Sequence, residues 1–127
     1  MSVKALVRLV QGGSIVACLV ASPASGEYVG MPGAVLQGLD KITARVSELL
    51  VRNGQTVQFG SLVIRVSACN RRPPEEPPEA TAFIEIGDGK RTPPTLLFRG
   101  WMFASSPAVS ALEHPVYDVR ILRCLVR

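Results

Sequence analysis

Histidine is almost missing from this chain, since His114 is the only one among 127 residues. Any serine or cysteine nucleophile that is activated by an imidazole base must therefore use His114. Cysteine is also scarce. Three cysteines are present, whereas a zinc site here would need a second histidine or more free cysteines. These two shortages exclude most catalytic and metal sites that are built from histidine and cysteine.

The motifs of other common sites are missing as well. No G-x-S-x-G nucleophile elbow occurs in the sequence. Residues 87–90 (GDGK) lack the Ser or Thr and the helix that follow in a phosphate-binding loop. The carboxylates of Glu75, Glu76 and Glu79 lie among Pro-Pro pairs rather than in the Asp- and Gly-rich pattern of a calcium loop. We therefore expect no metal site and no cofactor.

Ser110, His114 and Asp118 are spaced by four residues, which invites comparison with a catalytic triad. This spacing aligns the three side chains only on one continuous helix, and Pro115 interrupts that helix. We therefore predict no catalytic residues and no enzymatic activity. A hydrolase that uses His114 is the alternative. Without a catalytic role, His114 would cap the helical turn and hydrogen-bond a nearby backbone group.

The first 26 residues, Met1–Gly26, have the layout of a secretory signal peptide or N-terminal anchor. A basic start (Lys4, Arg8) precedes an apolar stretch and then small residues. The apolar stretch is shorter than the ~20 residues that a membrane-spanning helix needs. Cleavage after Ala24 or Gly26 and lipidation of Cys18 both fit the pattern. We expect a periplasmic protein, attached to the inner membrane if Cys18 is lipidated.

The net charge of +4 overstates the charge of the mature domain. Two of the 14 basic residues lie in the leader, which leaves 12 basic against 10 acidic residues. Nucleic-acid-binding domains usually concentrate more positive charge on one face. We therefore expect no nucleic acid among the partners.

Removal of the leader would leave two cysteines, Cys69 and Cys124. A pair of cysteines in an exported domain predicts a disulfide, and two buried free thiols are the alternative. On the chain-entropy model a cross-link over a loop of this length stabilises the fold by about 4 kcal/mol. This is a large part of the ~5–15 kcal/mol that is typical of a domain.

The remaining residues predict a small antiparallel β-sandwich or barrel in one domain, 39–127, after a flexible lead-in at 27–38. Asn53-Gly54 predicts a hairpin turn, and Ser106 followed by Pro107 predicts the start of a short helical turn to about Glu113. A helix at 39–51 is the second choice for that segment. Alternating apolar residues predict about six strands, at 39–51, 56–59, 61–69, 80–86, 95–103 and 116–125.

Two segments are candidates for binding a partner. Residues 70–79 (NRRPPEEPPE) contain four prolines and predict a stiff, exposed loop that loses little entropy on binding. Its candidate contact residues are Arg71, Arg72, Pro73 and Pro74. The second segment contains Trp101 and Met102, which are either part of the core or, if exposed, part of an interaction surface.

The C-terminal half resembles a known family. The resemblance lies in Cys69–Glu79, in FRGWMFASSPA at 98–108, in ALEHPVYD at 111–118 and in Cys124, and it extends over residues 36–124. These residues are similar to Domain of Unknown Function 2155, a family of uncharacterised exported alphaproteobacterial proteins. Genes of this family often lie near one for an accessory subunit of the proton-pumping NADH:ubiquinone oxidoreductase, respiratory complex I. The resemblance thus implies an accessory or assembly role on the periplasmic side of that complex.

We accordingly expect a non-enzymatic exported domain that binds a protein partner, namely a membrane-bound respiratory complex. The alternative is an envelope-binding module for a glycan, lipid or small ligand, which would need an apolar or aromatic pocket around Trp101 and Tyr117.

Overall fold

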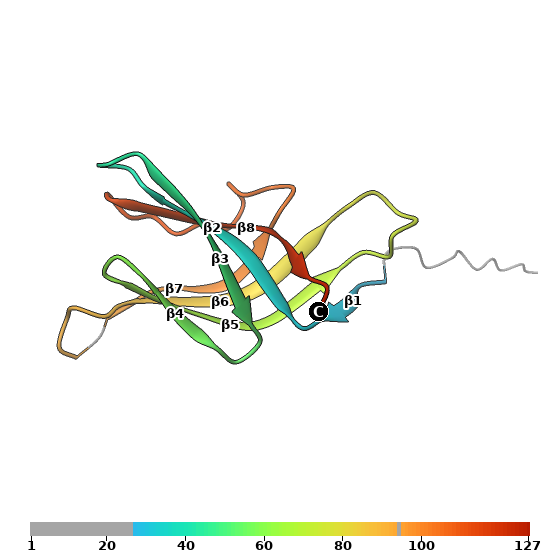
Figure 1. The fold of residues 1–127 in the computed structure, drawn as a ribbon, viewed down its shortest axis with the longest axis horizontal. Helices are drawn as coiled ribbons and strands as arrows, with labels where there is room; N and C mark the ends of the chain where they lie inside the picture. The colour runs from blue at the N-terminus through green and yellow to red at the C-terminus, as the bar shows by residue number, and fades with distance from the viewer. Residues whose placement is uncertain (1–26, 94) are drawn as a thin grey trace, which may run out of the picture.

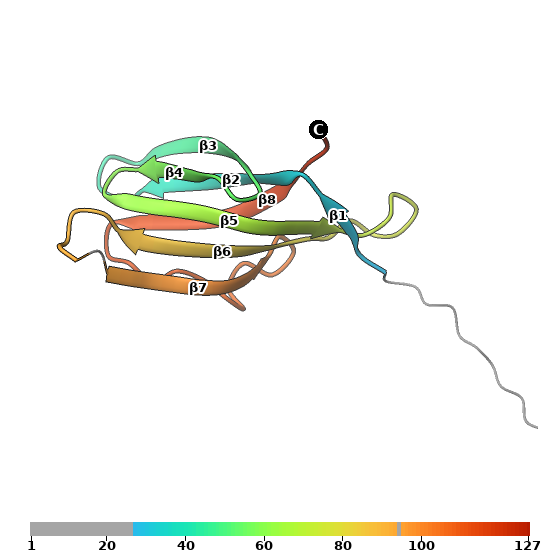
Figure 2. The same ribbon diagram turned by 90° about the horizontal axis from the view of Figure 1, so that it is seen from below.

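Two antiparallel sheets pack face to face in the computed structural model, which describes residues 27–93 and 95–127 (Figure 1). Sheet A has five strands and sheet B has three, and Figure 2 shows β4, β5, β6 and β7 of sheet A side by side. Sheet A consists of β1 (Val29–Met31), β4 (Thr56–Phe59), β5 (Leu62–Arg71), β6 (Ala80–Asp88) and β7 (Thr95–Phe103). Sheet B consists of β2 (Gly33–Asp40), β3 (Arg45–Arg52) and β8 (Tyr117–Leu125).

The predicted fold class, an all-β domain of antiparallel strands with one disulfide, is confirmed. The described residues form eight strands rather than about six. The core lies between the sheets, because alternate side chains of each strand point inward. Its buried residues include Ala34 and Leu36 of β2, Leu62, Ile64 and Val66 of β5, Ala82, Ile84 and Ile86 of β6, and Val119 and Ile121 of β8.

The prediction of a flexible lead-in at residues 27–38 is wrong. This segment forms β1 and most of β2, which is the central strand of sheet B. Its glycines serve close packing rather than flexibility. A Cβ atom on Gly33 would lie 2.5 Å from the carbonyl oxygen of Val51, and one on Gly38 would lie 2.8 Å from the ring of Phe59.

The prediction of a single strand at residues 39–51, and of a helix as second choice, is also wrong. The chain turns at Lys41–Ala44, between β2 and β3. The Asp40 carboxylate accepts hydrogen bonds from the N–H groups of Ile42 (2.9 Å) and Thr43 (3.2 Å), and Ala44 has a φ of 59°. The alternation of Ile42, Ala44 and Val46 with polar residues continues through this turn. A prediction from the apolar pattern alone therefore misses the turn.

Asn53-Gly54 forms the predicted turn but not the predicted hairpin. Gly54 has a φ of 86°, and the N–H of Gln55 donates to the carbonyl of Arg52 at 2.9 Å. The turn joins β3 of sheet B to β4 of sheet A, so the two strands belong to different sheets. The two-residue hairpin turn follows at Gly60-Ser61, between β4 and β5, where Gly60 has a φ of 60°.

The short helical turn at residues 106–113 is not found, and the described residues contain no helix. Successive turns occupy this segment instead. The N–H of Ser106 donates to the carbonyl of Phe103 (3.3 Å), and the N–H of Val109 donates to that of Ser106 (3.0 Å). The predictions for the leader, including the cleavage sites and Cys18, lie outside the described residues.

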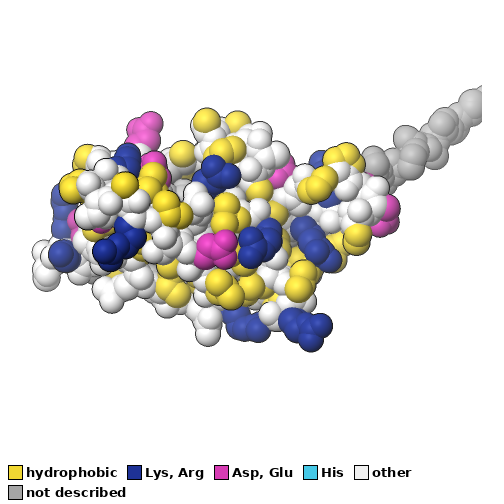
Figure 3. All heavy atoms as spheres, turned by 45° about the horizontal axis from the view of Figure 1, so that its top comes forward, with side chains coloured by type: hydrophobic (Ala, Val, Ile, Leu, Met, Phe, Trp, Pro, Cys, Tyr) yellow, Lys and Arg dark blue, Asp and Glu magenta, His cyan; other side chains and the backbone are white. Residues whose placement is uncertain are grey.

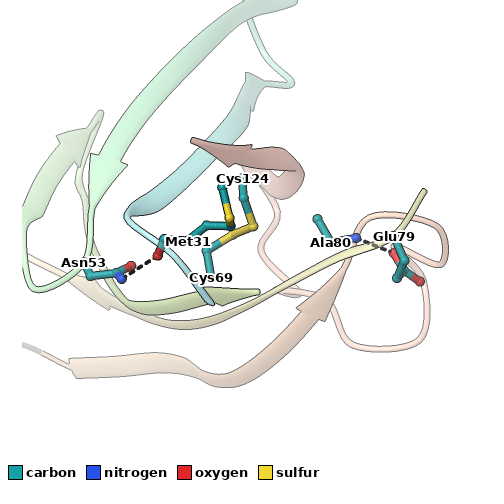
Figure 4. Close-up of a disulfide and its surroundings, with 6 residues drawn as sticks. All are labelled: Met31, Asn53, Cys69, Glu79, Ala80 and Cys124. Carbon is teal, nitrogen blue, oxygen red and sulfur yellow. Dashed lines mark hydrogen bonds between the residues drawn. A yellow bond between two sulfur atoms is a disulfide. The ribbon is translucent and has the colours of Figure 1, made fainter. Parts of the chain in front are cut away.

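The predicted disulfide joins Cys69 of β5 to Cys124 of β8 and therefore connects the two sheets (Figure 4). Their Cα atoms are 5.9 Å apart, and 55 residues separate them in the sequence. Both cysteines are buried. The neighbours of the two cysteines across the strands are Ala34 beside Cys124, and Ala82 and Met31 on either side of Cys69. Two of these three neighbours are alanines, which bury little apolar surface, so the covalent bond has a large share in holding this end of the sandwich together.

Replacing both cysteines, as Cys69→Ala with Cys124→Ala, should lower the free energy of unfolding by about 4 kcal/mol, because the unfolded chain regains the freedom of a long loop. Urea denaturation followed by circular dichroism measures the change. Wild-type protein unfolded with a reductant present should match the double variant. An unchanged urea midpoint in both cases would show that packing alone holds the sheets.

Candidate functional site: a groove at the open end of the sandwich

Sheet A extends beyond sheet B at the disulfide end of the molecule. Past Cys69, β5 continues to Arg71, which pairs with Ala80 at the start of β6. In sheet B, β8 ends one residue after Cys124, at Leu125, which pairs with Gly33. The inner face of sheet A at Ala80 therefore has no opposing strand of sheet B. The space between the sheets opens here into a groove.

The groove has a volume of about 630 Å³, within the ~300–1,000 Å³ that is usual for ligand sites. One wall is the proline-rich loop between β5 and β6, and the other is the end of β8 with the residues after it. Aliphatic side chains, prolines and three arginines share the lining. The lining residues are Val35, Leu50, Arg71, Arg72, Pro73, Pro74, Glu76, Pro78, Glu79, Ala80, Ala104, Ser105, Leu122, Arg123, Cys124, Leu125 and Val126. In Figure 3, apolar and basic side chains lie next to one another over the face that is drawn.

The loop that forms the first wall is closed at its base by hydrogen bonds. The N–H of Arg72 donates to the carbonyl of Glu79 at 3.1 Å, and the N–H of Glu76 donates to the carbonyl of Pro73 at 3.0 Å. The prolines fix their own φ angles. The wall is therefore held in shape before any ligand arrives. The loop predicted at 70–79 is found at 72–79, because Asn70 and Arg71 still pair with β6 as part of β5.

Glu79 ties this loop to the segment that follows β7. One carboxylate oxygen accepts the N–H groups of Ala80 (2.9 Å) and Ser105 (3.1 Å), and the other accepts the Ser105 hydroxyl. Figure 4 shows the bond to Ala80. Burial raises the pKa of the Glu79 carboxyl. The hydrogen bonds from Ser105 and Ala80 and the charge of Arg72 outweigh burial, so the pKa lies below its ordinary value.

The three arginines of the groove differ in their partners. The Arg72 guanidinium lies 3.4 Å from the Glu76 carboxylate and 5.0 Å from the centre of the Tyr28 ring. Arg123 lies 3.6 Å from the Glu48 carboxylate. The Arg71 side chain is half-buried and makes no ion pair or side-chain hydrogen bond with any residue in 27–93 or 95–127. Among the arginines of the groove, Arg71 is thus the one whose charge the described residues leave for a ligand.

The structure brings four of the six predicted partner-binding residues together. Arg71, Arg72, Pro73 and Pro74 all line the groove. Met102 is 2% exposed and belongs to the core. Trp101 lies on the outer face of sheet A, where its ring packs edge-to-face on Phe83 with 5.4 Å between centroids.

The sequence reasoning missed the second wall of the groove, Leu122–Val126, and the contribution of Leu50. The second wall could have been predicted from the disulfide. A bond between Cys69 and Cys124 places the residues beside Cys124 next to those after Cys69. Nothing in the sequence marks Leu50, because its place depends on how β3 lies in sheet B.

Ser110, His114 and Asp118 are not brought together as a triad, and no hydrogen bond among residues 27–93 and 95–127 joins them. The Nδ1 atom of His114 accepts the N–H groups of Val116 (3.0 Å) and Tyr117 (3.2 Å). The carboxylate of Asp118 pairs with Lys41 at 3.2 Å. His114 therefore makes the predicted hydrogen bonds to nearby backbone groups, but it caps no helical turn, because the described residues contain no helix.

Two further features bear on the class of site. Within the described ranges, no three His, Cys, Asp or Glu side chains are grouped so that they could hold a metal ion. The same ranges contain no helix with the length and hydropathy to cross a membrane.

Comparison with known proteins identifies the family. Residues 34–124, which include both cysteines and the proline-rich loop, match the family described as "Uncharacterized protein conserved in bacteria (DUF2155)". The chain belongs to the DUF2155 family. It is also 31% identical over 101 residues to the uncharacterized protein RP359 of Rickettsia prowazekii (strain Madrid E), a match that covers 79% of this chain and 65% of that protein. No solved structure matches the chain.

Glu79→Gln should weaken the hold of the loop in a pH-dependent way. The pKa of Glu79 is lower in the folded protein than the ordinary 4.5. The ionised carboxylate therefore stabilises the fold above that value, and this contribution is lost as the pH falls through the folded pKa. Urea denaturation at a series of pH values should show wild type more stable than Glu79→Gln at pH 7, with the two converging at acidic pH.

Glu75→Gln is the matched control, because Glu75 lies in the same loop and is exposed. It should follow wild type at every pH. A constant difference between wild type and Glu79→Gln across the pH range would contradict the role of the ionised carboxylate.

Proposed function

We propose that this DUF2155 protein is a non-enzymatic exported domain that binds a protein partner in its groove. The partner is respiratory complex I, and the protein acts on its periplasmic side as an accessory or assembly subunit. The observation that carries the proposal is the groove itself, whose walls are fixed by the disulfide and by the Glu79 contacts. A site that is formed in advance loses little entropy when a partner binds.

The chemistry of the groove suits a protein segment. Leu50 and Val126 are 61% and 63% exposed at its mouth, and burial of such side chains is favourable. Arginine is enriched at protein interfaces, and Arg71, Arg72 and Arg123 line the groove. Together they give an apolar contact area with charged groups that can fix the orientation of the partner.

Export is supported by the disulfide, because such bonds persist in oxidising compartments such as the periplasm. The layout of Met1–Gly26 as a leader points the same way. The choice of complex I rests on the gene neighbourhood that the family resemblance brings. Non-enzymatic action is supported by the engagement of His114 and Asp118 in other contacts.

An envelope-binding module for a glycan, lipid or small ligand remains the alternative, and one observation favours it. The volume of the groove, about 630 Å³, is that of a small-molecule site. The groove is not the pocket predicted for this alternative, because neither Trp101 nor Tyr117 lines it. Tyr117 packs instead against Phe59, with 5.5 Å between ring centroids.

Affinity purification from gently solubilised membranes tests the proposal. An epitope inserted after Lys90, in the loop between β6 and β7, lies at the opposite end of sheet A from the proline-rich loop and leaves Val126 free (Figure 1). Mass spectrometry should find the subunits of complex I with the wild-type chain in stoichiometric amounts. Recovery of the chain alone would overturn the proposed partner, and recovery with a co-purifying lipid or glycan would favour the alternative.

Leu50→Glu should reduce the recovery of complex I at least tenfold, because it places a charge in the apolar mouth of the groove. Val46→Glu is the matched control. Val46 is 56% exposed on the same face of β3, four residues away, and does not line the groove. Equal recovery with the two variants would show that the partner binds elsewhere.

His114→Ala should leave the recovery of complex I unchanged, because His114 lies outside the groove. Thermal unfolding of the purified variant shows whether loss of the Nδ1 contacts affects the fold. A loss of function in a variant that remains folded would favour the hydrolase hypothesis over the binding function.

A further inference from the structure

We infer that the groove receives an extended peptide segment of the partner, which adds to the free edge of β8 and places an Asp or Glu carboxylate on Arg71. This inference rests on the proposed protein-binding function and names the kind of segment that is bound.

The free edge of β8 is the first observation. In sheet B, β8 pairs with β2 on one side, and no other strand of the described residues pairs with its second edge, which therefore presents backbone groups that can accept an added strand. Five consecutive residues line the groove, the last four of β8 (Leu122–Leu125) and Val126 directly after it. Successive side chains of a strand point to opposite faces, so a groove that all five residues line reaches the edge of the strand. An extended peptide in this place can hydrogen-bond to that edge as an added strand.

The floor of the groove leaves room for the side chains of such a strand. Ala80 and Ala104 line it, and the N–H of Ala104 donates to the carbonyl of Ala80 at 2.9 Å, which continues the pairing of β6 with β7. The floor is therefore the inner face of sheet A, built from small residues. Every second side chain of an added strand would face this floor, and aliphatic side chains fit it best.

Arg71 supplies the charge requirement. It lies on the same face of β5 as Cys69, two residues earlier, and this is the inner face of sheet A. A half-buried guanidinium without a counter-ion is a costly arrangement, and a carboxylate can accept two parallel hydrogen bonds from it. The carboxylates of Glu76 and Glu79 in the lining are held by Arg72 and Ser105. A partner segment must therefore bring its own carboxylate.

The same two glutamates argue against a polyanionic ligand such as a nucleic acid or an anionic membrane surface, since Glu76 and Glu79 would repel it. One carboxylate within an aliphatic segment matches Arg71, whose side chain has no ion-pair partner among residues 27–93 and 95–127.

Phage display tests the inference on the protein purified through its inserted epitope. The library contains random ten-residue peptides between two linkers, so that only side-chain carboxylates are available. Enriched peptides should contain Asp or Glu flanked by aliphatic residues. An enriched peptide is then synthesised with blocked ends, together with a version in which its acidic residue is replaced by the amide. Fluorescence anisotropy measures the binding of both.

Arg71→Gln should weaken the acidic peptide about ten- to a hundredfold, as expected for a charge-assisted hydrogen bond, and should affect the amide version little. Arg71→Lys should recover part of the affinity. Arg65→Gln is the matched control, because Arg65 is an exposed arginine of β5 outside the groove. Alternate peptide bonds of the peptide can be N-methylated in two sets. If the peptide pairs with β8, methylation of the set whose N–H groups face β8 should abolish binding, and methylation of the other set should not.

Equal binding of the acidic peptide by wild type and Arg71→Gln would overturn the charge requirement. Insensitivity to N-methylation of both sets would overturn strand addition. If complex I is recovered in a Leu50-dependent way but the library yields no acidic peptide, the proposed function stands and this inference fails. If an acidic peptide binds through Arg71 but complex I is not recovered, the inference holds and the named partner is wrong.

Discussion

The disulfide between Cys69 and Cys124 is the constraint on which this end of the structure depends. It is the covalent link between the two sheets in addition to the chain itself. The side chains that pair with the two cysteines across the strands are those of two alanines, Ala34 and Ala82, and of Met31. Apolar burial is weak where side chains are small, so the sheets would separate here more easily than at the layers of Leu and Ile. The cross-link offsets this weakness at the place where the groove begins.

The groove exists because the two sheets extend to different lengths beyond the disulfide. Sheet B ends within one residue of the disulfide, whereas β5 and β6 of sheet A continue past it to Arg71 and Ala80. The core thus has an open end, and the proline-rich loop stands over it with Glu79 fastened to Ser105. Such a site needs no rearrangement to admit an extended chain. Its rigidity comes from covalent and hydrogen-bonded supports within the chain, and Cys124, Glu79 and Ser105, which provide them, are themselves part of the lining.

Much of the fold could be predicted because the alternation of apolar residues in Leu62–Cys69, Ala80–Ile86 and the last strand reflects one buried face. The failures have definite causes. Gly33 and Gly38 resemble linker residues, but each allows a close approach of a neighbouring strand or ring. The turn at Lys41–Ala44 keeps an apolar alternation by coincidence. Asn53-Gly54 is a turn with the expected backbone. Whether the two strands on either side of a turn pair with each other or join different sheets depends on packing against residues that are far away in the sequence.

The contrast between Trp101 and Arg71 shows why the site was only partly predictable. As isolated residues, a tryptophan is the stronger candidate for an interface. Trp101 is 40% exposed, but its ring lies on a flat sheet face and packs on Phe83, with Arg99 paired to Glu85 on the neighbouring strand positions. Its contacts are made within the chain. Arg71 is less conspicuous in the sequence, yet it lies in a concave, partly apolar site and has no counter-ion within the part of the chain that the structure describes. The groove can thus bind a ligand because the Arg71 side chain lies in a concave surface and has no ion pair with another described residue. This surface forms only when the fold brings the ends of β5 and β8 together.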